Sequence, residues 1–281
     1  MELWLKITIG VLIFLLISFG IYLFLICPGK NKKEIQKFIS YKYAHRGLHK
    51  EGVPENSLEA FKRAAEGGFG IELDVRLSSD GVLMVFHDDT LERMTEEEGR
   101  VDKRCASELR EIKLLGTDEH IPTFDEVLEL VSGKVPLLVE IKEDSSDTSV
   151  SAKVAQRLKS YEGDFIIESF NPLSLEAVKK KMPNVVVGIL SQNYLKSPKY
   201  RKPVHFLLHH FLLNCICRPN FIAFSHEDIK IPSYKVLTAF FRRPMFAWTI
   251  KSAQEEKRAI ENGFDTVIFE GYIPEKSTCK D

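Results

Sequence analysis

Residues 70–88 constrain the fold more than any other stretch, because their pattern is that of a β-hairpin. Asp80-Gly81 separates two apolar runs, and this dipeptide favours a two-residue turn whose central residues have positive φ. A turn at this point also sets the register of the two strands. The pairs that it predicts are Ser79 with Val82, Leu77 with Met84, Val75 with Phe86, and Asp74 with His87.

The predicted register gives the hairpin one apolar and one polar face, because side chains alternate along a strand and opposed residues share a face. The polar face carries Glu72, Asp74 and His87. Two carboxylates beside an imidazole suit a hard divalent cation, since Mg²⁺ and Ca²⁺ prefer oxygen ligands. A solvated face that binds nothing is the alternative. The apolar face carries Leu73, Val75, Leu77, Met84 and Phe86.

From residue 43 onward, apolar strand-like runs alternate with amphipathic helical runs. This alternation favours a parallel sheet covered by helices. Eight such units in about 240 residues predict an α/β protein of the (β/α)₈ TIM-barrel type, with a doubly wound open sheet as the alternative. The predicted strands are 43–47, the first arm of the hairpin, 136–142, 165–170, 185–190, 221–225, 246–250 and 266–269.

Helix boundaries are predicted from capping residues and from glycine or proline. Asn56 is expected to cap a helix over 58–66, with Glu59 reaching back to it. A capping box at Thr123 and Glu126 opens the helix that ends near residue 131. The remaining predicted helices are 107–115, a segment near 150–160, one from Asn171 to Pro183, and one from Ser252 to Gly263.

In a parallel barrel, catalytic residues lie at the carboxyl ends of the strands. Three carboxylates gathered there can hold one divalent metal, and Arg46 and Lys142 offer charged donors to phosphate oxygens. His45 and His87 change charge near neutral pH and can move protons, so the set fits cleavage of a phosphodiester. The polar residues at these ends are His45, Arg46, Glu72, Asp74, Glu140, Lys142, Ser169, Trp248 and Glu270.

Six short motifs between residues 43 and 273 occur in the order found in glycerophosphodiester phosphodiesterases, which this chain resembles. They are His45-Arg46-Gly47, Glu55-Asn56-Ser57, Glu72-x-Asp74, His87-Asp88, Glu140-x-Lys142 and Trp248-Thr249. The resemblance implies a phospholipase C-like barrel that hydrolyses deacylated phospholipids to an alcohol and glycerol 3-phosphate, using one Mg²⁺ or Ca²⁺. It implies that the metal ligands are Glu72, Asp74 and Glu140, that the acid/base pair is His45 and His87, and that Arg46, Lys142 and Trp248 contact the substrate.

The chain departs from the family pattern at two places. Ser57 replaces a threonine at a helix start, and Phe269-Glu270-Gly271 replaces Thr-Asp after the last strand. We expect the second change to affect substrate contacts more than catalysis. A lysophospholipase D acting on lysophospholipids at the membrane is a second interpretation of the same site. A catalytically dead lipid-binding or scaffold protein is a third.

Ile7–Ile26 is an uncharged apolar run of twenty residues, long enough to cross a bilayer as a helix. No small-residue cleavage site follows, so a retained signal anchor is expected. The predicted organisation is an anchor at 1–27, a basic juxtamembrane linker at 28–42, and a barrel domain at 43–281. Five lysines after the anchor favour a single-pass protein of the cell membrane with a cytoplasmic barrel, and an extracellular barrel is the alternative.

Composition excludes some functions and leaves one segment open. A net charge of −1 gives no indication of nucleic-acid binding, and the five scattered cysteines form neither a metal-ligand nor a disulfide pattern. Residues 192–217 combine basic and tyrosine residues with an apolar run. We expect either an ordinary barrel helix or a segment that docks the barrel mouth on an anionic membrane. The basic residues of the loop are Lys196, Lys199, Arg201 and Lys202.

Overall fold

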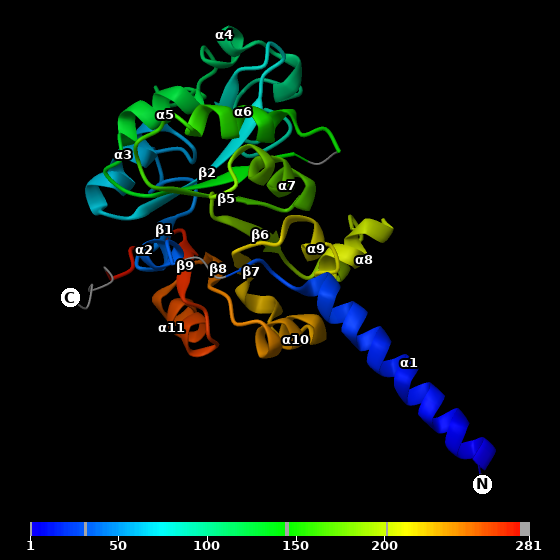
Figure 1. Ribbon diagram of the computed structural model, residues 1–281. Coiled ribbons are helices and arrows are strands. Elements are labelled where there is room, and N and C mark those ends of the chain that lie inside the picture. Colours follow the sequence, from blue (N-terminus) through cyan, green and yellow to red (C-terminus); the bar gives the residue numbers. More distant parts are fainter. Residues whose placement is uncertain (1, 31–32, 144–145, 201, 276–281) are drawn as a thin grey trace.

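The computed structural model describes residues 2–30, 33–143, 146–200 and 202–275, so Arg201 lies outside the described residues. It shows a closed barrel preceded by a long helix (Figure 1). Eight parallel strands close the barrel because the last strand pairs with the first, which confirms the TIM-type fold over an open sheet. These strands are β1 (Tyr43–Ala44), β2 (Gly70–Leu77), β4 (Leu137–Ile141), β5 (Phe165–Ser169), β6 (Val187–Ser191), β7 (Phe221–Ser225), β8 (Met245–Ile250) and β9 (Thr266–Phe269).

The hairpin is present, but its predicted register is wrong by one residue. Strand β3 (Leu83–Val85) runs antiparallel to β2 outside the barrel, and Val75 pairs with Val85. Gly81 has a φ of 79°, and its N–H donates to the Ser78 carbonyl at 3.0 Å. The Ser78 N–H donates in turn to the Val82 carbonyl at 3.0 Å. The glycine therefore ends a three-residue loop with a bulge instead of a two-residue turn.

The register shift moves Met84 and Phe86 away from Leu73 and Val75. They enter a separate small core, which is formed by the part of the chain that follows β2 and precedes β4. Residues from η1 (Val101–Lys103) and α4 (Ala106–Leu109) belong to the same core. The predicted helix 107–115 is wrong, because helical structure stops after the four residues of α4. A continuous helix would point Leu114 about 140° away from Leu109. The turn after α4 lets Leu109, Ile112 and Leu114 all enter this core.

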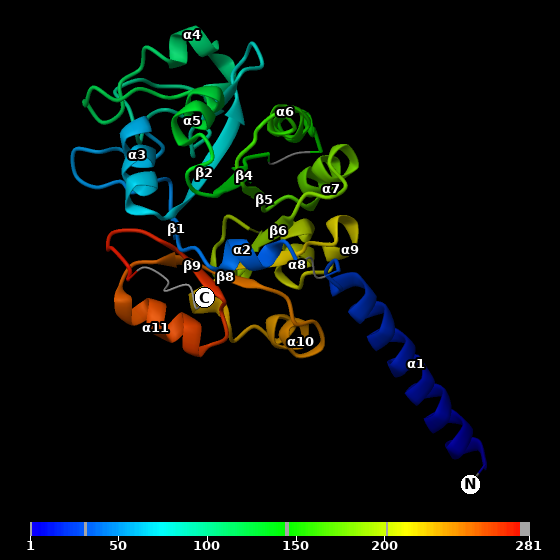
Figure 2. The same ribbon diagram turned by 60° about the vertical axis from the view of Figure 1, so that its left-hand side comes forward.

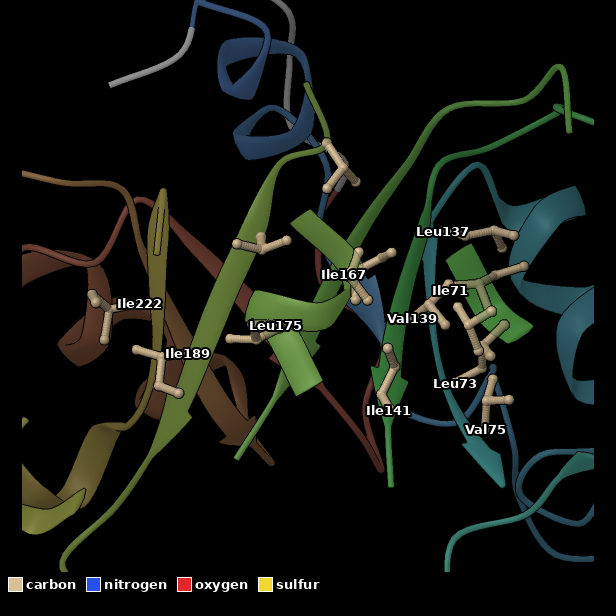
Figure 3. Close-up of a cluster of buried hydrophobic side chains, with 14 of the residues drawn as sticks. Ile71, Leu73, Val75, Leu137, Val139, Ile141, Ile167, Leu175, Ile189 and Ile222 are labelled. Atoms are coloured by element: carbon tan, nitrogen blue, oxygen red, sulfur yellow. The ribbon is translucent and has the colours of Figure 1, made fainter. Parts of the chain in front are cut away.

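The outer face of the barrel packs against helices, and its strand residues form the main core (Figure 3). Outward residues such as Leu73 and Val139 alternate with inward ones such as Asp74 and Glu140, as the pattern of period two predicts. The capping box at Thr123 and the cap at Ser252 are confirmed, whereas α10 was not predicted. The helices are α3 (Leu58–Gly67), α5 (Phe124–Val131), α6 (Ser149–Leu158), α7 (Pro172–Lys181), α8 (Pro203–His209), α9 (Asn214–Cys217), α10 (Pro232–Phe240) and α11 (Ala253–Glu261).

A short helix, α2 (Ile35–Ile39), closes the amino-terminal end of the barrel. Ile35 and Phe38 are buried in a second core made by inward residues of the lower barrel, including Leu138 and Phe246. The Tyr43 hydroxyl donates to the Phe38 carbonyl at 3.0 Å. Helix α2 is thus part of the barrel's own packing at this end.

Helix α1 (Glu2–Ile26) projects away from the barrel in both views (Figures 1 and 2). Among the described residues it is the one helix that is long and apolar enough to cross a membrane. A membrane anchor and a signal sequence share these properties.

Candidate active site

Three buried carboxylates meet at the carboxyl end of the barrel. Glu72 and Asp74 point inward from β2, and Glu140 points inward from the neighbouring β4, where it pairs in register with Asp74. One oxygen of each acid lies within 4.8 Å of the others. The set is built by the parallel register of β2 and β4, and the all-oxygen donors match the preference of Mg²⁺ or Ca²⁺. The three residues therefore fit a divalent cation.

Two cationic side chains, those of Lys142 and Arg46, contact the acids. The Lys142 ammonium lies 2.6 Å from Glu140 Oε1 and 3.0 Å from Asp74 Oδ1. Arg46 donates its backbone N–H to Glu72 Oε2 at 2.8 Å, and its guanidinium Nε lies 3.4 Å from Asp74 Oδ2. If all three acids were ionised, their charge would exceed that of the two cations, and a bound divalent ion would reverse this excess.

Asn56 has a different role from the predicted one. Ser57 caps α3 by accepting the Ala60 N–H at 3.2 Å, while Asn56 has a φ of 55° and turns toward the barrel. Its side-chain amide donates to Asp74 Oδ2 at 2.8 Å. Positive φ is uncommon for a residue with a side chain and is maintained only where the surroundings hold it. Asn56 is thus a buried partner that orients Asp74.

The two predicted histidines line the same cavity, and a carboxylate holds each ring. His45 Nδ1 donates to Glu270 Oε2 at 2.6 Å, and His87 Nδ1 donates to Asp88 Oδ1 at 2.6 Å. These bonds fix the tautomer and leave Nε2 of each ring available. The position of His87 comes from the chain after β3, where Arg76 donates to the His87 carbonyl at 2.7 and 2.9 Å.

The pKa values of the three acids shift in different directions, because burial and neighbouring acids raise a carboxyl pKa while the two cations lower it. Burial, together with Asp74 and Glu140, raises the pKa of Glu72 well above its ordinary value. Burial would also raise the pKa of Asp74, but Lys142 and Arg46 hold it well below the ordinary value. Burial raises the pKa of Glu140 to about 7 although Lys142 opposes it. Without a cation, the cluster does not hold three full negative charges.

The pKa values of both histidines are lower than that of a histidine in water, so both rings lose their proton more readily. Burial lowers the pKa of His87 to about 4, against the opposing effect of Asp74. Burial also lowers the pKa of His45, while the hydrogen bond to Glu270 raises it. Each ring is therefore neutral near pH 7 before substrate binds, and its Nε2 can accept a proton.

The cavity at this end has a volume of about 220 Å³. It is lined by five of the predicted site residues: His45, Arg46, His87, Lys142 and Trp248. Trp248 lies on β8. Several wall residues of the cavity were not predicted, among them Glu168, Phe170 and Tyr200. A larger hollow of about 490 Å³ lies at the other end of the barrel, beside α2, away from the carboxylate cluster.

Glu168, on β5, is a fourth buried acid of this cavity, and it pairs in register with Glu140 on β4. Burial, with Glu72 and Glu140 nearby, raises its pKa well above the ordinary value. Its Oε2 atom has no hydrogen-bond partner among the described residues. The alternation of inward and outward residues along β5 could have predicted the inward position of Glu168, because Ile166 and Glu168 lie on the same face of the strand.

Comparison with known proteins bears on this site. The model of the glycerophosphoryl diester phosphodiesterase family matches residues 45–271. A glycerophosphodiester phosphodiesterase of Caldanaerobacter subterraneus is 36% identical over 241 residues, which cover 80% of this chain and 91% of that protein. One from Bacillus altitudinis is 33% identical over 172 residues, covering 56% and 68% of the two chains.

Solved structures share the barrel. An Oleispira antarctica phosphodiesterase in complex with the product sn-glycerol-3-phosphate superposes with a TM-score of 0.67 at 24% identity, covering 83% of this chain and 94% of that one. The glycerophosphodiester phosphodiesterase of Thermotoga maritima gives 0.62 at 29% identity, covering 82% and 94%. Barrel and relatives together define a phosphoric diester hydrolase. Within that class, the chain belongs to the glycerophosphoryl diester phosphodiesterase family.

Proposed function

We propose that the protein hydrolyses glycerophosphodiesters to an alcohol and glycerol 3-phosphate with the help of one Mg²⁺ or Ca²⁺. The observation that carries this proposal is the meeting of three acids, two cations and two carboxylate-held histidines in one cavity. The related protein from Caldanaerobacter, which bears the name of this activity, supports it. The complete site also argues against a catalytically dead lipid-binding protein.

The chain would bind the phosphodiester through Arg46 and Lys142. Both side chains are held against acids, so their remaining N–H groups are pre-oriented for phosphoryl oxygens. Glu72, Asp74 and Glu140 would hold the metal, which supplies positive charge that offsets the charge of the phosphoryl oxygens. Trp248 and Phe170, whose rings meet edge to face at 5.6 Å, form an apolar wall beside this position.

His45 and His87 would move the protons. One neutral ring accepts a proton at Nε2 from the attacking water as its oxygen bonds to phosphorus. The other ring, in its protonated form, donates a proton to the alcohol oxygen as the bond from that oxygen to phosphorus breaks. The carboxylates of Glu270 and Asp88 favour the protonated form of each ring and keep its plane fixed. The negative charge of a bound phosphodiester further favours protonation of the donating ring.

A product assay tests the function. The full chain should convert glycerophosphocholine and glycerophosphoethanolamine to glycerol 3-phosphate and the free alcohol. EDTA should abolish turnover, and Mg²⁺ or Ca²⁺ should restore it. Lysophosphatidylcholine belongs in the same assay, because α1 would hold the barrel beside lipid. Full activity after EDTA and exhaustive dialysis would rule out the metal, and turnover of lysophospholipid alone would favour the lysophospholipase D alternative.

We infer that α1 is a single-pass anchor, with 1–27 as the anchor and 43–281 as the catalytic domain. The lysines that follow α1 favour a cytoplasmic barrel. This arrangement would place a soluble catalytic domain at the surface of the cell membrane.

Replacing Glu270 by glutamine should lower kcat by less than the removal of His45 itself, because the ring remains but loses its charged partner. The hydrogen bond to Glu270 raises the pKa of His45. Its loss should therefore move the limb of the pH–rate profile that belongs to His45 to lower pH. Glu261→Gln, exposed at the end of α11, is the control. An unchanged pH–rate profile in Glu270→Gln would contradict a positioning role for Glu270.

A further inference from the structure

The last turn of α1 is built into the barrel. Ile26 is fully buried, and its carbonyl accepts a hydrogen bond from the Asn214 side chain at 3.1 Å. Arg218 donates to the carbonyls of Phe24 and Cys27, each at 2.9 Å, and its guanidinium carbon lies 4.5 Å from the centre of the Phe24 ring. These contacts fix the direction in which α1 leaves the barrel.

A second contact lies further along α1. The ring of Phe19 meets the ring of Phe240, at the end of α10, edge to face with 5.6 Å between centres. Phe19 is about 10 Å from Ile26 along the helix axis. If α1 spans a bilayer, the end of α10 is therefore carried to the level of the lipid.

Exposed aromatic side chains gather beside this exit. Outside α1, the exposed phenylalanines among the described residues are Phe206 on α8, at 51% exposure, and Phe240, at 56%. Figures 1 and 2 show α8 and α10 next to the place where α1 leaves the barrel, with α4 at the far end. Large apolar side chains are thus exposed on two helices near the place where α1 leaves the barrel.

The charge of the same region complements an anionic surface. Residues 192–244 carry nine Lys and Arg against two Asp and Glu, whereas the whole chain carries 39 against 40. Lys202, at the start of α8, and Lys235 and Arg242, on and after α10, are exposed. The two acids, Glu227 and Asp228, lie in η3 (His226–Asp228), and Asp228 is buried against Lys196. The remainder of the chain is acidic, so the basic charge is concentrated beside the anchor.

We propose that α8 and the end of α10 form a docking surface that seats the barrel on an anionic phospholipid bilayer. This docking surface consists of Lys202, Val204, Phe206, Lys235, Phe240 and Arg242. Continuity with α1 identifies the partner as the bilayer, since Phe240 is already in contact with the anchor. Basic residues near anionic lipid strengthen such contact by roughly five-fold per charge. The proposal rests on α1 as a membrane anchor and extends the proposed function.

Docking would also reach the active site. His205, in the first turn of α8, stacks on Tyr194 with 5.8 Å between ring centres and meets Tyr200 at 5.0 Å. Tyr200 lines the catalytic cavity. Two aromatic contacts therefore connect α8 with the wall of the substrate site, and lipid contact at α8 would fix which side of the barrel mouth faces the membrane.

The test measures amide hydrogen exchange of the full chain in nanodiscs of phosphatidylcholine alone and of phosphatidylcholine with phosphatidylglycerol. Peptides from α8 and α10 should exchange at least about five-fold more slowly in the anionic nanodiscs. The variant Lys202→Glu/Phe240→Glu should lose this difference. The matched control Lys103→Glu/Leu115→Glu, with an exposed base and an exposed apolar residue beside α4, should keep it.

Equal exchange of α8 and α10 in the two nanodiscs would overturn the docking surface, and so would failure of the chain to enter nanodiscs. Loss of the difference in the control variant would also overturn it. Turnover of soluble glycerophosphocholine should be unchanged in both variants, because neither alters the cavity. A chain that shows the protection yet hydrolyses no glycerophosphodiester would refute the proposed function and leave the docking surface supported.

Discussion

His45→Ala and His87→Ala should each lower kcat for glycerophosphocholine by roughly 10²–10⁴-fold, the usual contribution of a general acid or base. Each ring is held by one carboxylate and faces the cavity, so its removal takes away the proton carrier proposed at that position. Steady-state kinetics of the purified, metal-loaded chain measures the effect. Thermal unfolding should show that both variants remain folded.

The double variant His45→Ala/His87→Ala shows whether the two rings act in the same turnover or contribute independently to the rate. Both proton transfers belong to one turnover, so the double variant should be little slower than the slower single variant. His120→Ala, exposed in the lobe between β2 and β4, is the matched control and should retain full activity. A single histidine variant that keeps more than about a tenth of the wild-type rate would show that its ring is not a proton carrier.

Much of the barrel could be predicted because its pattern is repeated. Each inner strand contributes alternating inward and outward residues, and helices with capping residues follow most strands. The pairing of Glu72 and Asp74 on one face depends only on this alternation. It was therefore correct even though the hairpin register was wrong by one residue. His87 reaches the site because Arg76 and Asp88 hold it, and not because it lies opposite Asp74 in a ladder.

The unpredicted contacts depend on closure of the barrel or on unusual backbone geometry. Glu270 follows β9 and meets His45, which follows β1, only because these first and last strands pair. The expectation that Glu270 affects substrate contacts more than catalysis did not include this contact. The sequence pattern predicts a helix cap at Asn56, because it does not show that the positive φ of this residue turns the amide toward Asp74.

Glu72→Gln should have opposite effects on catalysis and on the stability of the metal-free protein. Turnover should fall by more than about a hundred-fold, because one of three metal ligands is lost, and even outer contacts of a metal site are worth 10–100-fold. The metal-free variant should nevertheless be more stable than wild type at pH 8. Its amide is neutral, so it does not oppose Asp74 and Glu140, and its oxygen can still accept the Arg46 N–H.

The pH dependence of that stability difference follows from the direction of the pKa shift. The pKa of Glu72 is raised in the folded protein, so folding of the wild type is favoured when this carboxyl is protonated. The advantage of Glu72→Gln should be largest at high pH and disappear as the pH falls to the ordinary glutamate pKa of about 4.3. Denaturant unfolding in EDTA at pH 8 and pH 5 measures it, with exposed Glu66→Gln as the control. Added Mg²⁺ or Ca²⁺ should then stabilise wild type and the control but not Glu72→Gln. Equal stabilisation of all three proteins by metal would place the cation elsewhere.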